Sequence, residues 1–142
     1  MAIVERATGS DARLTTAAPA IATEGLTKIY GRLKAVDGVT LRVPAGQVFG
    51  LLGPNGAGKT ITIKLLCGLV SPTAGRAALN GFDVGRQRSR AVMQLGAVLE
   101  GGRNVYWSLS AWQNLLYFGR LKGLSAQEIK PRAERLLRDL GL

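Results

Sequence analysis

The sequence lacks histidine, has one cysteine and contains no long uninterrupted apolar run. Because Cys67 is alone, no internal disulfide can form, which agrees with a reducing cytoplasm. The apolar stretches 50–52 and 65–70 are short and broken by glycine, and neither approaches the ~20 residues of a membrane-spanning helix. Residues 1–20 have no apolar centre of the kind that marks a secretion signal, so we expect a disordered tail there.

What is present is ordinary for one soluble folded domain, with 142 residues of which 46% are hydrophobic and 20% charged. The formal net charge of +10 favours nucleic acid as a partner when it is taken alone. The basic residues are instead spread over several expected elements, without interleaved aromatics that could stack on bases: Arg86, Arg88, Arg90, Arg120, Lys122, Arg132, Arg135 and Arg138. We therefore expect a solvated basic surface and no direct nucleic-acid partner.

Alternating and apolar runs predict short strands in the first half of the chain. Residues 21–30 and 39–43 have strand patterns, and 44–46 form a turn. The apolar run 47–52 predicts a strand buried on both faces of a sheet. A glycine-rich loop follows, and from Lys59 the apolar residues recur at roughly helical spacing until Gly68. The order is therefore strand, glycine loop, helix.

The second half is expected to begin with strands and end in helices. Residues 76–79 form a small strand before Asn80-Gly81, a strong hairpin signal, and 94–99 is another apolar strand. Two helix starts have the capping-box pattern, a serine followed three residues later by Gln or Glu: Ser110 with Gln113, and Ser125 with Glu128.

The last expected helix has an apolar stripe and a glycine terminator. The stripe comprises Ile129, Ala133, Leu136, Leu137 and Leu140, and Gly141 follows it. Pro131 would remove a backbone donor from a helix that began after Ser125. We therefore expect the regular helix to begin at Lys130 or Pro131, after a loose turn.

Residues 53–60 satisfy the pattern G-x-x-x-x-G-K-[ST] of a phosphate-binding loop. Gly53, Gly56 and Gly58 can take backbone angles that turn successive N–H groups inward, which forms an anion nest. The helix that starts at about Gly58 adds its positive end. Lys59 is placed to reach the β and γ phosphates of ATP, and the Thr60 hydroxyl to coordinate Mg²⁺.

The residues of this loop, together with residues 64–69 and the Pro-Thr-Ala-Gly sequence at 72–75, strongly resemble those of the ATP-binding-cassette (ABC) transporter ATPases. The resemblance covers the chain from Ala22 to the end of the sequence. The resemblance implies an α/β fold of the P-loop NTPase, ABC ATPase type. Residues 21–99 would form the nucleotide-binding core, the start of a RecA-like fold with its antiparallel β subdomain. Residues 100–142 would hold the glutamine-loop equivalent and the beginning of the helical subdomain, so the fold would be partial and truncated.

The resemblance also implies ATP and Mg²⁺ as ligands, with Lys59 as the catalytic residue. Tyr30 matches the aromatic residue that stacks on adenine in this family, although a packed strand tyrosine is the alternative. The implied nucleotide-binding residues are Tyr30, Gly53, Pro54, Asn55, Gly56, Ala57, Gly58, Lys59, Thr60 and Ile61.

Two positions depart from the family pattern. Ile61 stands where a hydroxyl residue usually helps to hold the α phosphate, so only its backbone N–H is available. Glu100 occupies the glutamine position, and its carboxylate can approach Mg²⁺ directly or through water. The predicted metal-binding residues are therefore Thr60 and Glu100, with an exposed loop glutamate as the alternative for Glu100.

Residues 101–115 resemble the part of the helical subdomain that receives the coupling helix of a membrane permease. Tyr106, Trp107 and Leu109 are the expected contact residues, since aromatics are enriched at interfaces. The alternative is that Trp107 and Trp112 fill the core of the subdomain, which we prefer for Trp112. The sequence of this segment resembles the subfamilies that export drugs, lipids or polysaccharides.

The resemblance implies the ATPase subunit of an exporter at the cytoplasmic face of the membrane, working with a permease subunit and a second ATPase subunit. The family's Leu-Ser-Gly-Gly-Gln signature, acidic strand and switch histidine are expected beyond Leu142, so we expect this chain alone to bind nucleotide weakly and not to hydrolyse it. Two alternatives stay open: a soluble cassette ATPase acting on nucleic acid or the ribosome, and a non-catalytic nucleotide-binding fragment. The coding sequence downstream of Leu142 would separate them.

Overall fold

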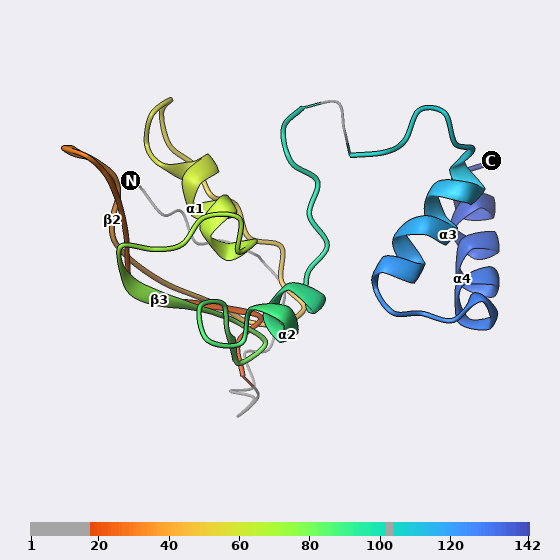
Figure 1. The fold of residues 1–142 in the computed structure, drawn as a ribbon, viewed down its shortest axis with the longest axis horizontal. Coiled ribbons are helices and arrows are strands. Elements are labelled where there is room, and N and C mark those ends of the chain that lie inside the picture. Colours follow the sequence, from red (N-terminus) through yellow and green to blue (C-terminus); the bar gives the residue numbers. More distant parts are fainter. Residues whose placement is uncertain (1–17, 102–103) are drawn as a thin grey trace. The chain divides into compact units, whose positions relative to one another are not determined.

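A computed structural model describes residues 18–101 and 104–142, so residues 1–17 of the expected tail lie outside it. The chain divides into two compact units, the first ending at Gly96 and the second beginning at Ala97 (Figure 1). Within the described ranges, the helices are all too short or too polar to cross a bilayer.

The first unit is built on a four-stranded antiparallel sheet in the order β2-β1-β3-β4. Its strands are β1 (Ile21–Tyr30), β2 (Leu33–Val43), β3 (Ala74–Leu79) and β4 (Phe82–Asp83). Two helices, α1 (Lys59–Leu66) and α2 (Arg88–Met93), accompany the sheet. The strands predicted at 21–30, 39–43 and 76–79 are confirmed, the last two as parts of longer strands.

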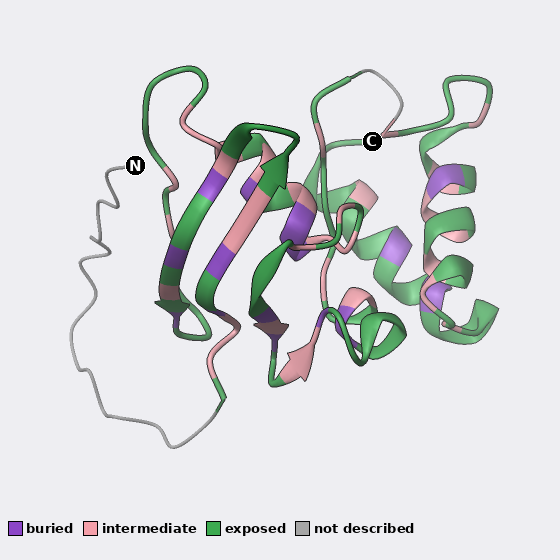
Figure 2. Ribbon diagram, turned by 60° about the vertical axis from the view of Figure 1, so that its left-hand side comes forward, coloured by how far each residue is buried: buried purple, intermediate pink, exposed green. Residues whose placement is uncertain are grey.

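The core of the first unit joins the sheet to α1. Buried and exposed residues follow one another along the strands in Figure 2, as expected for a sheet with one covered face. Leu26 of β1 and Leu65 of α1 are almost completely buried in the same cluster. The helix that carries Lys59 at its first position is thus fixed on the sheet by its last turn.

The β3–β4 hairpin turns at the predicted Asn80-Gly81 pair. Both residues have positive φ, 47° for Asn80 and 83° for Gly81. Two successive positive φ angles define a type I′ turn, whose twist matches that of the flanking strands. The hairpin prediction is confirmed.

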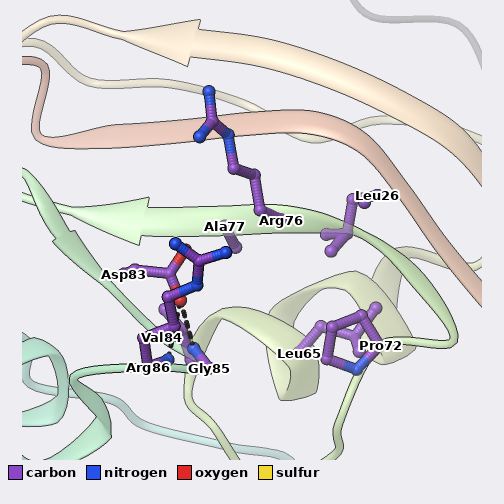
Figure 3. A pocket seen from close by; sticks show the side chains of 10 residues that line it. Leu26, Leu65, Pro72, Arg76, Ala77, Asp83, Val84, Gly85 and Arg86 are labelled. Atoms are coloured by element: carbon purple, nitrogen blue, oxygen red, sulfur yellow. Dashed lines mark hydrogen bonds between the residues drawn. The ribbon is translucent and has the colours of Figure 1, made fainter.

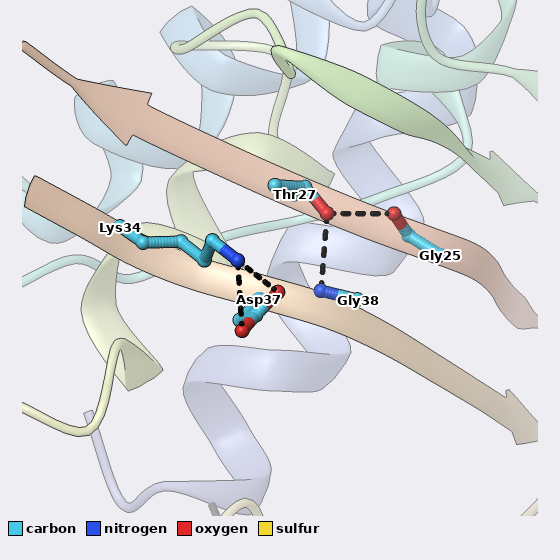
Figure 4. A network of polar contacts seen from close by, with 5 residues as sticks. All are labelled: Gly25, Thr27, Lys34, Asp37 and Gly38. Carbon is cyan, nitrogen blue, oxygen red and sulfur yellow. Dashed lines mark hydrogen bonds and ion pairs between the residues drawn. The ribbon is translucent and has the colours of Figure 1, made fainter. Parts of the chain in front are cut away.

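Threonine hydroxyls replace backbone hydrogen bonds where the β1–β2 ladder is irregular. Thr27 Oγ1 donates to the Gly25 carbonyl at 2.9 Å and accepts the Gly38 N–H at 3.0 Å, as Figure 4 shows beside the Lys34–Asp37 ion pair. The register skips Ala35 on β2, because Lys28 pairs with Val36 and the next residue of β1 pairs with Lys34. This bulge lies where the glycine loop reaches the sheet.

The strands predicted at 47–52 and 94–99 are wrong for this structure, because neither segment forms a ladder. Val48 is 88% exposed and Val98 87% exposed, so these apolar residues are not covered on both faces. A buried parallel strand needs hydrogen-bonded neighbours. Every described strand of the chain already belongs to the antiparallel sheet, which leaves none to pair with these runs.

The second unit contains a pair of packed helices, α3 (Ala111–Leu121) and α4 (Ala126–Asp139). Both predicted capping boxes are confirmed, with Ser110 and Ser125 as N-caps and with reciprocal bonds to Gln113 and Glu128. Gly119 allows the two helices to approach closely, since a Cβ there would lie 2.7 Å from the Ile129 side chain.

Helix α4 begins earlier than predicted. It runs without a break from Ala126 through Pro131, so the expected loose turn before Lys130 is wrong. The capping box offsets the backbone bond lost at the proline, because it satisfies N–H groups at the helix start. The predicted terminator is confirmed: Gly141 has a φ of 71°, and Leu142 N–H donates to the Leu137 carbonyl at 2.9 Å.

Candidate nucleotide-binding site

The glycine loop is shaped by its contact with β2. Gly56 and Gly58 have φ angles of 83° and 84°, a region that favours glycine. A Cβ on Gly58 would overlap the carbonyl oxygen of Ala35, the residue that the β1–β2 register skips. The loop therefore rests backbone against backbone on the sheet, which only glycine permits at this position.

Helix α1 starts directly at the end of this loop, as predicted. Gly58 is its N-cap and provides no side-chain hydrogen bond, and no acidic residue lies in the first turn. The first N–H groups of a helix have no partner within the helix. The start of α1 thus offers backbone donors and a positive dipole end to an anion.

Lys59 folds over the loop that precedes it. Its Nζ donates to the carbonyls of Gly53 at 2.7 Å and Pro54 at 2.8 Å, while Ala57 N–H donates to the Pro54 carbonyl at 3.2 Å. The ion pairs of the described residues do not include Lys59. Its ammonium charge is held at the loop by dipoles alone and is not neutralised by a carboxylate of the described chain.

The residues after Lys59 divide between surface and core. Thr60 is exposed, whereas Ile61 packs against the hydrophobic core and Thr62 donates through Oγ1 to the Gly58 carbonyl at 2.9 Å. The Ile61 side chain therefore contributes to core packing and not to the surface of the loop. Cys67 caps the other end of α1, where partial burial raises the pKa of its thiol.

Tyr30 lies at the end of β1 and is 44% exposed. It pairs with Leu33, and Ala35 follows two residues along β2, about 7 Å away at the usual strand rise. Because Gly58 packs on Ala35, the first unit brings Tyr30 and the end of the glycine loop to the same part of the β1–β2 hairpin. Lys28, which the sequence reasoning did not single out, has its Nζ 4.9 Å from the centre of the Tyr30 ring.

Glu100 is exposed and belongs to the second unit, whereas Thr60 belongs to the first. The loop that holds Glu100 is fastened by Asn104, whose amide accepts from Leu99 N–H at 3.1 Å and donates to the Leu99 carbonyl at 2.7 Å. Among the described residues, no three His, Cys, Asp or Glu gather as a metal site. Thr60 suits a Mg²⁺ ion whose other ligands are phosphates and water. The metal role of Glu100 stays a prediction.

Tyr106, one of the residues expected to contact a permease, belongs to an aromatic cluster with Tyr117 and Phe118 in the second unit. Tyr106 packs edge-on against Tyr117 with ring centres 5.0 Å apart, and their hydroxyls lie 3.3 Å apart. This hydrogen bond raises the pKa of Tyr117. Trp107 is 84% exposed, which does not fit a core role, while Trp112 is half-buried and its core role stays a prediction.

Asn114 fastens the start of α3 to the segment before it, which the sequence reasoning missed. Its Oδ1 accepts Tyr106 N–H at 2.8 Å, and its Nδ2 donates to three carbonyls at 3.0–3.1 Å, those of Tyr106, Leu109 and Ser110. Asn114 is buried, and the signal in the sequence that could have pointed to this role is an asparagine directly after the Ser110–Gln113 capping box.

The first unit contains a cavity of 230 Å³, and Figure 3 shows the side chains that line it. It is lined by residues of β3, by Asp83 to Arg86 and by Leu26, Leu65 and Pro72, and by none of residues 53–60. The Asp83 carboxylate accepts the N–H groups of Gly85 and Arg86 at 2.8 Å each, and Arg76 is paired with Glu24 at 2.7 Å. This cavity is therefore separate from the loop whose helix start and lysine suit an anion.

A strand hairpin that supports a G-x-x-x-x-G-K-[ST] loop, with an antiparallel sheet and a helical pair, defines an ABC-type nucleotide-binding unit. The sequence profile of the family described as "ABC transporter" matches residues 36–142. The chain belongs to this family and represents part of its ATP-binding domain.

Particular relatives support the assignment. The chain is 43% identical over 129 residues to the daunorubicin/doxorubicin resistance ATP-binding protein DrrA of Streptomyces peucetius, covering 87% of this chain and 37% of the relative. It is 43% identical over 119 residues to the Nod factor export ATP-binding protein I of Ralstonia nicotianae, covering 84% and 37%. The chain thus spans well under half the length of these relatives.

A solved structure of an ATP-binding subunit of an ABC transporter superposes with a TM-score of 0.74 at 30% identity, covering 83% of this chain and 49% of that chain. The predicted fold class is therefore confirmed as the ABC ATPase fold, of which this chain matches about half.

Proposed function

We propose that this chain binds Mg-ATP through residues 53–60, with Tyr30 stacking on the adenine. The observation that carries the proposal is the position of Lys59. Its ammonium lies over a glycine loop at the start of a helix and is neutralised by no carboxylate of the described residues. A polyphosphate would replace the two carbonyl contacts with stronger charge-assisted hydrogen bonds.

The residues of the loop have distinct roles in this proposal. Backbone N–H groups of the segment from Gly58 to Ile61 hold the phosphate oxygens, Lys59 also binds the β and γ phosphates through its ammonium, and the Thr60 hydroxyl takes one Mg²⁺ position. When bound, Mg²⁺ offsets the charge of the phosphates. In this scheme residues 21–99 form the nucleotide-binding core, and residues 100–142 begin the helical subdomain.

For the protein as a whole, we propose an ATPase that energises export by a separate membrane permease, paired with a second ATPase subunit at the cytoplasmic membrane face. Relatives named for drug resistance and Nod factor export support the exporter assignment. The exposed Trp107 and Tyr106 support a docking role for the start of the second unit. The sequence of this chain contains no Leu-Ser-Gly-Gly-Gln and no histidine, so we expect binding without efficient turnover from these 142 residues.

The test compares Lys59→Ala with Lys64→Ala in the 142-residue chain. Both lysines lie on α1, but only Lys59 contacts the loop carbonyls. Titration calorimetry with Mg-ATP should show a loss of about 10- to 100-fold in affinity for Lys59→Ala, the usual worth of hydrogen bonds to a charged group. Lys64→Ala should bind like wild type. Equal affinities for Lys59→Ala and wild type would overturn the proposal.

A further inference from the structure

We propose that Lys28 is a positioning residue for the nucleotide base: it holds the Tyr30 ring from one side so that the other side can receive adenine. The inference rests on the proposed nucleotide binding and on Tyr30 as the stacking residue. Lys28 lies outside the glycine loop, and its proposed role concerns binding of the base and not of the phosphates.

The geometry is that of a cation over an aromatic face. Lys28 Nζ lies 4.9 Å from the centre of the Tyr30 ring. Residues two apart on a strand project to the same side, so β1 itself places the two side chains together. An ammonium within about 6 Å of a ring centre is attracted by the ring quadrupole.

The same ammonium is anchored to the chain that follows the phosphate-loop helix. Lys28 Nζ donates to the Ser71 carbonyl at 2.9 Å. Thr73 reinforces this contact, because its N–H donates to the Thr27 carbonyl at 2.8 Å and its Oγ1 accepts the Ile29 N–H at 3.1 Å. Lys28 is therefore held in place by backbone far from it in sequence.

Two physical consequences follow for a base that stacks on Tyr30. The ring is already oriented before the ligand arrives, so less side-chain entropy is lost on binding. The cation also draws electron density toward its own face of the ring, which favours contact of the opposite face with an electron-rich base. Since Tyr30 is 44% exposed, the ring is accessible for such a contact.

The test uses two ligands that differ by the nucleoside. Mg-ATP contains base and phosphates, whereas Mg-tripolyphosphate contains only the phosphates. In the 142-residue chain, Lys28→Met should weaken Mg-ATP about two- to five-fold, the worth of an exposed cation–π contact, and leave tripolyphosphate affinity unchanged. Lys28→Arg, which keeps a cation, should restore most of the ATP affinity.

The matched control is Lys34→Met, on the neighbouring strand. Lys34 forms an ion pair with Asp37 at 3.2 Å, and its backbone lies opposite Ile29 in the β1–β2 ladder. The Lys34→Met substitution therefore removes an equal charge from the same hairpin. It should alter neither affinity. In a double-mutant cycle, Lys28→Met should have no further effect on ATP binding once Tyr30 is Ala, because the lysine acts through the ring.

The outcomes separate this inference from the proposed function. If wild type binds both ligands and Lys28→Met weakens them equally, Lys28 acts as a general charge and the positioning role is wrong. An unchanged ATP affinity in Lys28→Met, or an equal loss when Tyr30 is absent, would also overturn it. If wild type binds neither ligand, the proposed function fails and the inference falls with it.

Discussion

The glycine loop of the first unit and the helical pair of the second unit both depend on glycine, but for different physical reasons. Gly123 and Gly141 end α3 and α4 with positive φ, and their N–H groups donate to carbonyls only three residues back, while the next residue of each donates five residues back. Gly58 has a positive φ as well, but it must also make room for Ala35, a residue of another strand. The helical pair is thus specified by local signals, whereas the loop needs the sheet beneath it.

The comparison is tested most strongly by placing alanine at two loop glycines. Gly58→Ala and Gly56→Ala introduce the same backbone strain, with φ angles of 84° and 83°, but a Cβ at Gly56 meets no atom within 4 Å. We expect Gly58→Ala to destabilise the first unit by about 3 kcal/mol or more, because backbone overlap adds to the strain, and Gly56→Ala by about 1–2 kcal/mol.

Urea unfolding followed by backbone amide signals of β1 and β2 measures these losses. Both tryptophans lie in the second unit, so tryptophan fluorescence reports that unit, whereas these amide signals report the first. Equal destabilisation by the two substitutions would show that the contact with Ala35 is unimportant.

The next largest effect is expected from Asn114→Ala in the second unit. The substitution removes four hydrogen bonds of a buried side chain and leaves backbone groups of Tyr106 without their partner. We expect a loss of about 2–4 kcal/mol, since unpaired buried polar groups are costly. Asn114→Asp keeps the acceptor for Tyr106 N–H but places a carboxylate oxygen opposite three carbonyl oxygens, so it should lose at least as much as Asn114→Ala. Tryptophan fluorescence during urea unfolding provides the measurement, and a wild-type midpoint for Asn114→Ala would show that this region is held by other contacts.

A smaller effect is expected from the capping serines. Ser110→Ala and Ser125→Ala each remove one reciprocal cap, at a cost of about 1 kcal/mol. The helical circular dichroism signal should melt earlier in both variants. The two capping boxes are local and alike, so the two variants should lose similar amounts of stability. A much larger loss of stability in one variant would contradict the claim that local signals specify the helical pair.

The smallest effect concerns pH. Hydrogen bonds from Ser125 lower the pKa of Glu128 below its ordinary value, while the corresponding Gln113 does not titrate. A lowered folded pKa means that the cap of α4 is at full strength above the ordinary glutamate pKa of about 4.3 and is lost as pH falls through the folded pKa.

Amide chemical shifts of Ser125 should therefore titrate in acid, whereas those of Ser110 should not change in step with them. In Ser125→Ala, the pKa of Glu128 should rise toward its ordinary value. An unaltered Glu128 pKa in this variant would contradict the assigned cause.

Features specified by nearby residues could be predicted from the sequence, whereas features that need distant residues could not. The Asn80-Gly81 hairpin, both capping boxes and the Gly141 terminator were predictable, because each depends on residues close together in the chain. The runs 47–52 and 94–99 have the apolar pattern of strands, but a ladder also needs neighbours, which a local pattern does not reveal.

By itself, the sequence determined the glycine loop and its lysine, the helix that begins there and the resemblance that the family assignment later confirmed. Only the tertiary structure decided that Gly58 packs on Ala35, that Lys59 folds over its own loop and that Lys28 lies against Tyr30. The reason is physical. Backbone angles and caps are set by neighbouring residues, whereas the approach of a loop to a sheet is set by strand pairing and by core packing over long separations.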